Sequence, residues 1–160
     1  MESELWLIAC FNGRYYVGRK DEVDAAIDAL CAELPNVHNL HRHAVRYGGV
    51  RIVGATLWSH VPHEHQVAVA RSLTDYGQIT VPTATGFRKV TVTDTNEWHR
   101  QDVEFIRQHI EDAKTAGEKV VVLTHHAPLG TGVSAPQYDG MRKCSDLQCR
   151  VPFCDTDIRV

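Results

Sequence analysis

Two adjacent histidines, His125 and His126, come directly after the apolar run at 120–123 and Thr124. Two imidazoles at the end of an apolar run could contact a bound ligand, so this pair is a candidate binding site. The same position also suits a polar strand end exposed to solvent, or a core histidine whose ring is satisfied by the backbone. Position in the sequence alone does not decide between these interpretations.

Other histidines and cysteines also form clusters in the sequence, but their spacing gives weaker support for a binding site. The histidine clusters are His38, His41 and His43, and His60, His63 and His65. Both clusters lie beside turn-forming residues, so we expect loops, with capture of a single zinc or nickel ion as the weaker alternative. The cysteines Cys144, Cys149 and Cys154 show a C-x4-C-x4-C spacing. Structural zinc sites use a shorter C-x2-C spacing, so we expect ordinary free or partly buried thiols here.

The elements that must position these residues alternate between strands and helices. Strands are expected at 5–10, in two runs within 43–57, at 87–93 and at 119–124, with helices at 21–34, about 65–73 and 94–117, and a loop at 74–85. Gly48 and Gly49 suit a tight hairpin turn. Asp21 is the expected N-cap of the first helix, and Asp94 with Glu97 indicates a capping box for the last one. This order predicts an α/β fold.

The run at 119–124 is almost continuously Val and Leu, which is typical of a strand buried on both faces, and we expect it to be central. In an open α/β sheet, the ligand crevice lies beyond the carboxyl ends of the strands. His125 and His126 would then lie at this crevice.

Length and composition limit which kinds of protein this chain can be. The chain has 160 residues, enough for one domain spanning 1–160, with 43% hydrophobic and 23% charged residues. Its formal net charge of −3, without a block of basic residues, argues against nucleic-acid or anionic-membrane partners. No signal peptide or transmembrane helix is visible, and five cysteines form an odd set. Free thiols in the cytoplasm are therefore expected.

Three stretches together resemble the calcineurin-like metallophosphoesterases, in the subgroup of single-domain phosphoesterases. These stretches are GVRIVGATLWS at 49–59, LTDYGQIT at 73–80 with DTNEWHRQDVEFI at 94–106, and VVVLTHHAP at 120–128. The resemblance implies two β-sheets packed face to face and flanked by helices. It also implies a hydrolase of phosphoester substrates that uses a pair of divalent metal ions (Mn, Fe or Zn) to activate water.

The resemblance assigns few site residues to this chain. His125 matches the family's lone histidine ligand, whereas His126 matches a companion residue that would contact substrate or orient the ligands. Asn12 matches the ligand asparagine, with a plain Asn-Gly turn as the alternative. The family's Asp-x-His, Gly-Asp-x-x-Asp and Gly-His-x-His blocks have no counterpart, and Gly13 replaces the proton-donating histidine. No catalytic residue is therefore assigned.

These losses shape the functional expectation. We expect a partial metallophosphoesterase-like β-sandwich, truncated or degenerate at both ends and corresponding to the middle-to-late part of such a domain. Without carboxylates to neutralise two divalent cations, metal occupancy is doubtful, so the isolated chain should be weakly active or inactive. The alternative is a non-catalytic binding or self-assembly module that forms a homo-oligomer through an exposed sheet edge.

Overall fold

The computed structural model describes residues 6–8 and 19–128. In chain order its elements are β1 (Trp6–Ile8), α1 (Lys20–Glu33), β2 (Val37–Asn39), β3 (His43–Tyr47), β4 (Val50–Ala55), the 3-10 helix η2 (His63–His65), α2 (Gln66–Ser72), α3 (Asp75–Gln78), β5 (Thr80–Thr83), β6 (Gly86–Lys89), α4 (Val92–Ala116) and β7 (Lys119–Thr124). The fold is mixed α/β, as the sequence predicted. No described helix is long and apolar enough to cross a membrane.

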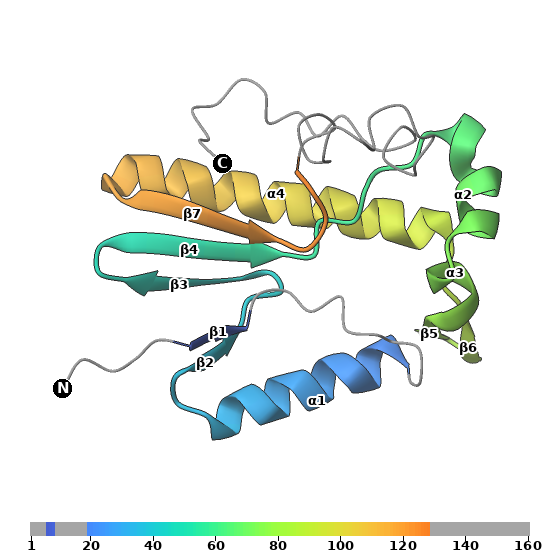
Figure 1. Cartoon of the computed structure of the whole chain (residues 1–160), viewed down its shortest axis with the longest axis horizontal. Coiled ribbons are helices and arrows are strands. Elements are labelled where there is room, and N and C mark those ends of the chain that lie inside the picture. Colours follow the sequence, from blue (N-terminus) through green and yellow to red (C-terminus); the bar gives the residue numbers. More distant parts are fainter. Residues whose placement is uncertain (1–5, 9–18, 129–160) are drawn as a thin grey trace, which may run out of the picture.

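The described strands form three small sheets. The largest has the order β3-β4-β7, in which β4 pairs antiparallel with β3 and parallel with β7. Strands β1 and β2 form a parallel pair, and β5 and β6 form an antiparallel pair. Figure 1 shows that β4 and β7 point in the same direction, with α2 and α3 lying beyond their carboxyl ends. The carboxyl ends of these two strands therefore lie side by side.

Glycine conformation explains two of the element boundaries that the sequence predicted. Gly48 and Gly49 both have positive φ, 55° and 78°, which a tight β3–β4 hairpin requires. Gly117 ends α4 in the left-handed conformation, and its N–H bonds back to the last turn. The hairpin and the end of the long helix are thus confirmed.

Helix starts differ from the expectation. The N-cap of α4 is Thr91, not Asp94, and Asp94 is the third helical residue, which completes the capping box with Thr91. α4 therefore takes up the end of the strand expected at 87–93, of which only β6 forms. The N-cap of α1 is Arg19, whereas Asp21 lies in the first turn, where its charge complements the helix dipole. The expected loop at 74–85 contains α3 and β5.

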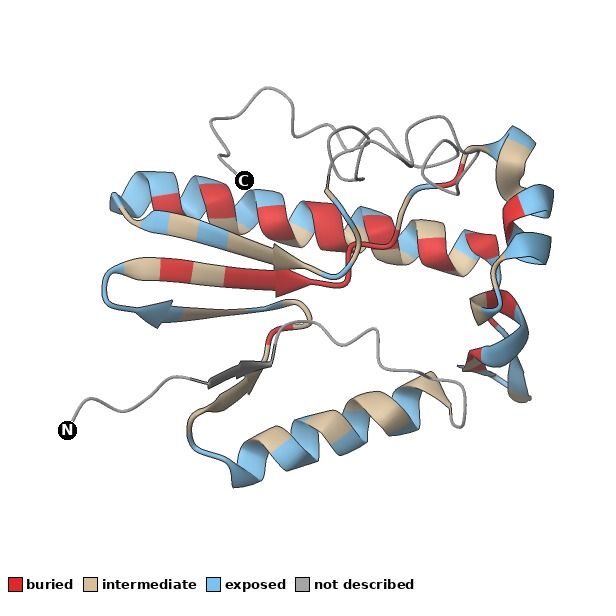
Figure 2. Ribbon diagram, viewed as in Figure 1, coloured by how far each residue is buried: buried red, intermediate tan, exposed pale blue. Residues whose placement is uncertain are grey.

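The hydrophobic core consists of two clusters, which meet where β4 ends. One cluster packs α4 against the β3-β4-β7 sheet and contains Val53, Ala55, Leu57, Val103, Ile106 and Ile110. A second cluster gathers α2, α3 and β5 near the start of α4, and includes Trp58, Val69, Tyr76 and Ile79. Figure 2 shows the buried residues concentrated along β4 and on one side of α4. Of the described elements, β4 and α4 are therefore held in place by the most buried side chains.

The prediction that the run at 119–124 is a central strand buried on both faces is wrong for the described part of the chain. There β7 pairs only with β4, which is the central strand, so β7 lies at the sheet edge. Val120 and Val122 pack toward α4, whereas Val121 on the opposite face is 44% exposed. The sequence of a uniformly apolar strand does not show which face is buried, because both faces carry apolar side chains.

Candidate functional site

The candidate site is the carboxyl edge, defined as residues 56–58 after β4 and 125–126 after β7. Parallel pairing of the two strands places Ala55 opposite Thr124, so the segments that follow them run side by side. The backbone N–H of His126 donates to the carbonyl oxygen of Thr56 at 3.0 Å. The edge is thus assembled from residues about seventy positions apart in sequence, as pairing of distant strands allows.

The two histidines of this edge differ in exposure. His125 is exposed and His126 is half-buried, and their rings meet edge to face with centroids 5.0 Å apart. The ring of His126 also lies 5.0 Å from that of Trp58. Burial, followed by the neighbouring charge of His125, lowers the pKa of His126 to about 4. His126 is therefore neutral at pH 7 and packs as an aromatic ring.

Helix α4 holds the segment that follows β4. The Nδ1–H of the buried His99 donates to the carbonyl oxygen of Trp58. Burial lowers the pKa of His99 despite this bond, which keeps the ring neutral. The ring of His60 lies 5.9 Å from that of His99. His60 and His99 thus border the carboxyl edge on its α4 side.

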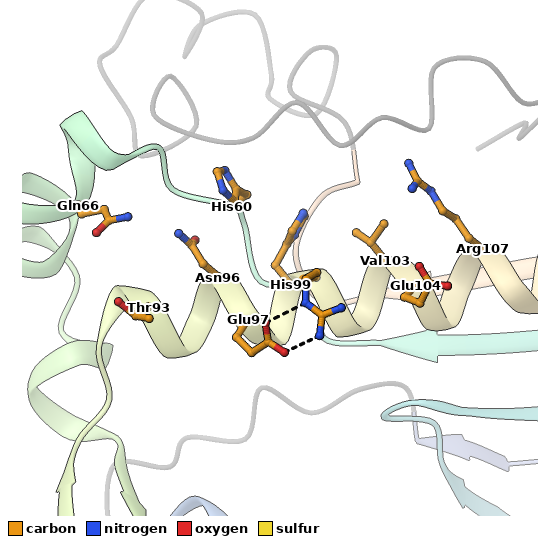
Figure 3. A pocket seen from close by; sticks show the side chains of 10 residues that line it. His60, Gln66, Thr93, Asn96, Glu97, His99, Val103, Glu104 and Arg107 are labelled. Atoms are coloured by element: carbon orange, nitrogen blue, oxygen red, sulfur yellow. Dashed lines mark hydrogen bonds and ion pairs between the residues drawn. The ribbon is translucent and has the colours of Figure 1, made fainter.

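A groove of about 500 Å³ opens along α4 next to these histidines. Its lining includes His60, Asn96, His99, Arg100, Val103 and Arg107. Figure 3 shows Asn96, His99, Val103 and Arg107 along one side of α4, with His60 on the segment that follows β4. Arg100 forms an ion pair of 2.6 Å with Glu97. The volume falls in the range of small-molecule sites.

His41 reaches the carboxyl edge from the end of β2. Its Nδ1 lies 3.0 Å from the hydroxyl oxygen of the buried Thr56. Its Nε2 lies 3.5 Å from the Arg42 guanidinium, which can only donate, so the Nδ1–H donates to Thr56. Burial, then the charges of Arg42 and Lys20, lower the pKa of His41 to about 4. The turn at 41–42 confirms the loop that the sequence predicted for His41, but within it the ring is half-buried and bonded to Thr56.

Asp102 of α4 is the residue that sequence reasoning missed. Its side chain is fully buried, and Oδ2 accepts the backbone N–H of Leu57 at 2.8 Å. Oδ1 has no hydrogen-bond partner among the described residues, and the Arg42 Nε lies 3.5 Å away. Burial raises the pKa of Asp102 to about 6, although the Leu57 N–H and the charges of Arg42 and Lys20 oppose the shift. A signal was available, because an acidic residue interrupts the apolar side of a predicted helix.

The predicted site residues have mixed outcomes. His125 lies beyond the carboxyl end of β7, where the sequence placed it. Asn12 and the three C-terminal cysteines lie outside the described residues. No group of three or more His, Cys, Asp or Glu side chains that could hold a metal ion is present in the part of the chain that the structure describes. The two histidine clusters therefore do not assemble a metal site from described residues alone. The prediction that both clusters lie in loops is wrong for His38 in β2, for His43 in β3, and for His63 and His65 in η2.

Comparison with known proteins adds one relative. No family model matches the chain, and no solved structure matches it. Uncharacterized protein L509 of Acanthamoeba polyphaga mimivirus is 27% identical over 123 residues, which cover 74% of this chain and 43% of that protein. The chain thus spans less than half the length of the curated relative that it matches, and the name of that relative assigns no activity.

Proposed function

We propose that this chain is a metallophosphoesterase-like protein in which His125 is a ligand for a divalent metal ion (Mn, Fe or Zn) and phosphoesters are the substrate class. In this proposal the β3-β4-β7 sheet and α4 are part of a helix-flanked β-sandwich. One observation carries it: the THH segment follows a strand that pairs in parallel with the strand before Thr56, so both segments share one edge. Ligand sites of α/β sheets occupy such edges.

The donor set limits the activity expected of this chain. The described part of the carboxyl edge offers the exposed imidazole of His125, whereas the ring of His126 is packed against Trp58. Two adjacent divalent cations need bridging carboxylates to offset their repulsion, and Asp102 is buried against the backbone of Leu57. The described residues therefore fit weak binding of one borderline cation and not a metal pair. Turnover of the isolated chain should be weak or absent.

Metal binding at His125 can be tested without relying on turnover. Zinc is titrated into the full chain while the histidine ring signals are followed by NMR, with manganese as a paramagnetic probe. We expect zinc to shift the His125 signals first, and manganese to broaden them first. His63 is also exposed, but it lies in η2 and serves as a matched control. Equal perturbation of His63 and His125, or none at either, would contradict the proposal.

Activity is the second arm of the test. The chain is incubated with manganese or zinc and an aryl phosphodiester, and the release of the aryl alcohol is measured for wild type, His125→Ala and His63→Ala. Any metal-dependent turnover should be lost in His125→Ala and kept in His63→Ala. Turnover that survives His125→Ala would exclude His125 as the ligand, even if the chain is a phosphoesterase.

A specific observation also favours self-assembly as a second candidate function. Val45, Ile52 and Val121 are aligned across the three strands by the register of the sheet. Their neighbours Ala44, Val53 and Val122 pack toward α4, so the aligned trio lies on the opposite face. On that face Tyr47 is 49% and Val121 44% exposed. An apolar face of this kind suits contact with a second copy of the chain.

Sedimentation tests this candidate directly. A dimer formed through this face should dissociate in Val121→Lys, because a lysine ammonium cannot be buried cheaply between two apolar sheets. Val67 of α2 is 64% exposed, so Val67→Lys serves as the control. A monomer at all concentrations, or a dimer insensitive to Val121→Lys, would rule out assembly through this face.

A further inference from the structure

Two side chains of α4 bond to consecutive residues of the segment that follows β4. Asp102 accepts the N–H of Leu57, and His99 donates to the carbonyl oxygen of Trp58. The two side chains are three positions apart on the helix, so they project from the same side. Both are buried, with exposed fractions of 0% for Asp102 and 8% for His99. Together they clamp this segment from the interior.

The clamped segment has an unusual backbone conformation. Leu57 has a φ of 54°, in the left-handed region that residues with a β-carbon rarely adopt. Such a conformation persists only where the surroundings determine it. The hydrogen bond from the Leu57 N–H to Asp102 holds Leu57 in this conformation, since it fixes the peptide plane between Thr56 and Leu57. The orientation of the Thr56 carbonyl, which belongs to the same peptide, is fixed with it.

The orientation of His126 depends on both of the contacts made by Asp102 and His99. Its N–H donates to the Thr56 carbonyl oxygen, and its ring lies against the ring of Trp58. The first contact depends on the peptide held by Asp102, and the second depends on the residue held by His99. The adjacent His125 then leaves β7 in a direction set by its neighbour. The chain of contacts runs from α4 to the segment after β4 and on to the two histidines.

We propose that Asp102 and His99 are positioning residues for the carboxyl edge: by holding the backbone at Leu57 and Trp58, they set the orientation of His126 and hence the direction in which His125 is presented. The consequence for metal binding rests on the proposed function, whereas the orientation of His126 does not. Neither residue touches substrate or metal in this role. Arg42 contributes its charge, with Nε 3.5 Å from the second carboxylate oxygen of Asp102.

A merely structural role predicts a different outcome. If Asp102 and His99 only stabilised the core, removing them would lower the global stability, and no amide would lose more protection than those that exchange through global unfolding. If they are positioning residues, the His126 N–H should lose protection beyond that global loss. Ile110 provides the matched control, because it is 7% exposed on α4 and packs in the cluster with Val53, away from His126.

The test is hydrogen exchange of the full chain, read amide by amide for wild type, Asp102→Ala, Asp102→Asn, His99→Ala, His99→Asn and Ile110→Ala. Asparagine at 102 keeps an oxygen acceptor for the Leu57 N–H. Asparagine at 99 keeps an N–H donor near the position of the imidazole Nδ1. We expect the alanine variants at 99 and 102 to lose at least about tenfold in His126 protection relative to Ile110→Ala at matched global stability. The asparagine variants should remain within about threefold of wild type by the same measure.

Equal His126 protection in Asp102→Ala and Ile110→Ala would overturn the positioning role of Asp102, and the same comparison decides His99. Zinc titration of these variants then separates this inference from the proposed function. If zinc shifts His125 in wild type, Asp102→Ala should need about tenfold more zinc for the same shift. If zinc never shifts His125, the proposed function fails, while the exchange data still decide the positioning role.

Discussion

The buried carboxyl group of Asp102 makes the stability of the protein depend on pH in a direction opposite to that of most acidic residues. Its pKa in the folded state is about 6, above the ordinary 3.8. A group whose pKa is raised by folding favours the folded state when it is protonated. Its contribution is fully present below about pH 4, and it is lost as the pH rises through the folded-state pKa near 6.

The magnitude follows from the size of the shift. A pKa change of about two units corresponds to about 3 kcal/mol, at roughly 1.4 kcal/mol per unit, and the full burial of the side chain calls for no discount for solvent screening. Asparagine at 102 cannot ionise, so Asp102→Asn removes this dependence. The free energy of unfolding of Asp102→Asn minus that of wild type should therefore rise by about 2.5 kcal/mol between pH 4 and pH 8, the remainder of the change lying below pH 4.

Urea denaturation of both proteins at half-unit pH steps from 4 to 8 measures this difference. Subtraction removes the other titrating groups, including Asp94 and Glu97, whose pKa values lie at about 2 because of ion pairs with Arg88 and Arg100. It also removes any constant cost of placing the asparagine NH₂ near Arg42. A difference that stays constant within about 0.5 kcal/mol over this range would refute the assignment of Asp102 as a buried acid with a raised pKa.

Three further substitutions test the framework that holds the site. Ile106→Ala removes a side chain that is 1% exposed between α4 and the sheet, and it should lower the unfolding free energy in urea by about 2–5 kcal/mol. Thr91→Ala deletes the N-cap of α4 and should cost about 1 kcal/mol in the same assay, whereas Thr93→Ala, at the second residue of the helix, should cost clearly less. Gly117→Ala forces a β-carbon onto a φ of 66°, so the melting temperature should fall by several degrees for a loss of about 1 kcal/mol.

Local signals in the sequence predicted the elements whose causes are themselves local. The Gly48-Gly49 pair determines a hairpin by its backbone freedom, and Gly117 ends a helix for the same reason. Val103, Ile106 and Ile110 recur at intervals of three and four in the sequence, a spacing that marks the face of α4 that packs on the sheet. The placement of His125 beyond the end of β7 followed from the same kind of signal, a strand-like run that stops.

Features that depend on tertiary contacts could not be predicted in this way. The edge position of β7 depends on which strands pair, and a run of valines does not indicate whether one or two strands will pair with it. The loop location of His41 was predicted, but its bond to Thr56 was not, because that bond joins the segments after two strands, β2 and β4. The unusual φ of Leu57 has no signature in its residue type, since glycine or asparagine would be expected there.

Pairing between β4 and β7 also has a consequence for the order of folding. The β3–β4 hairpin closes through a turn of two glycines, whereas Val50 meets Lys119 only after a chain of roughly seventy residues has looped back. Contacts over such separations form late, because the entropy of closing the loop must be overcome before they contribute. The segment carrying His125 should therefore dock among the last steps of folding. Until it does, a run of three valines and a leucine remains available to pair with other chains during synthesis or refolding.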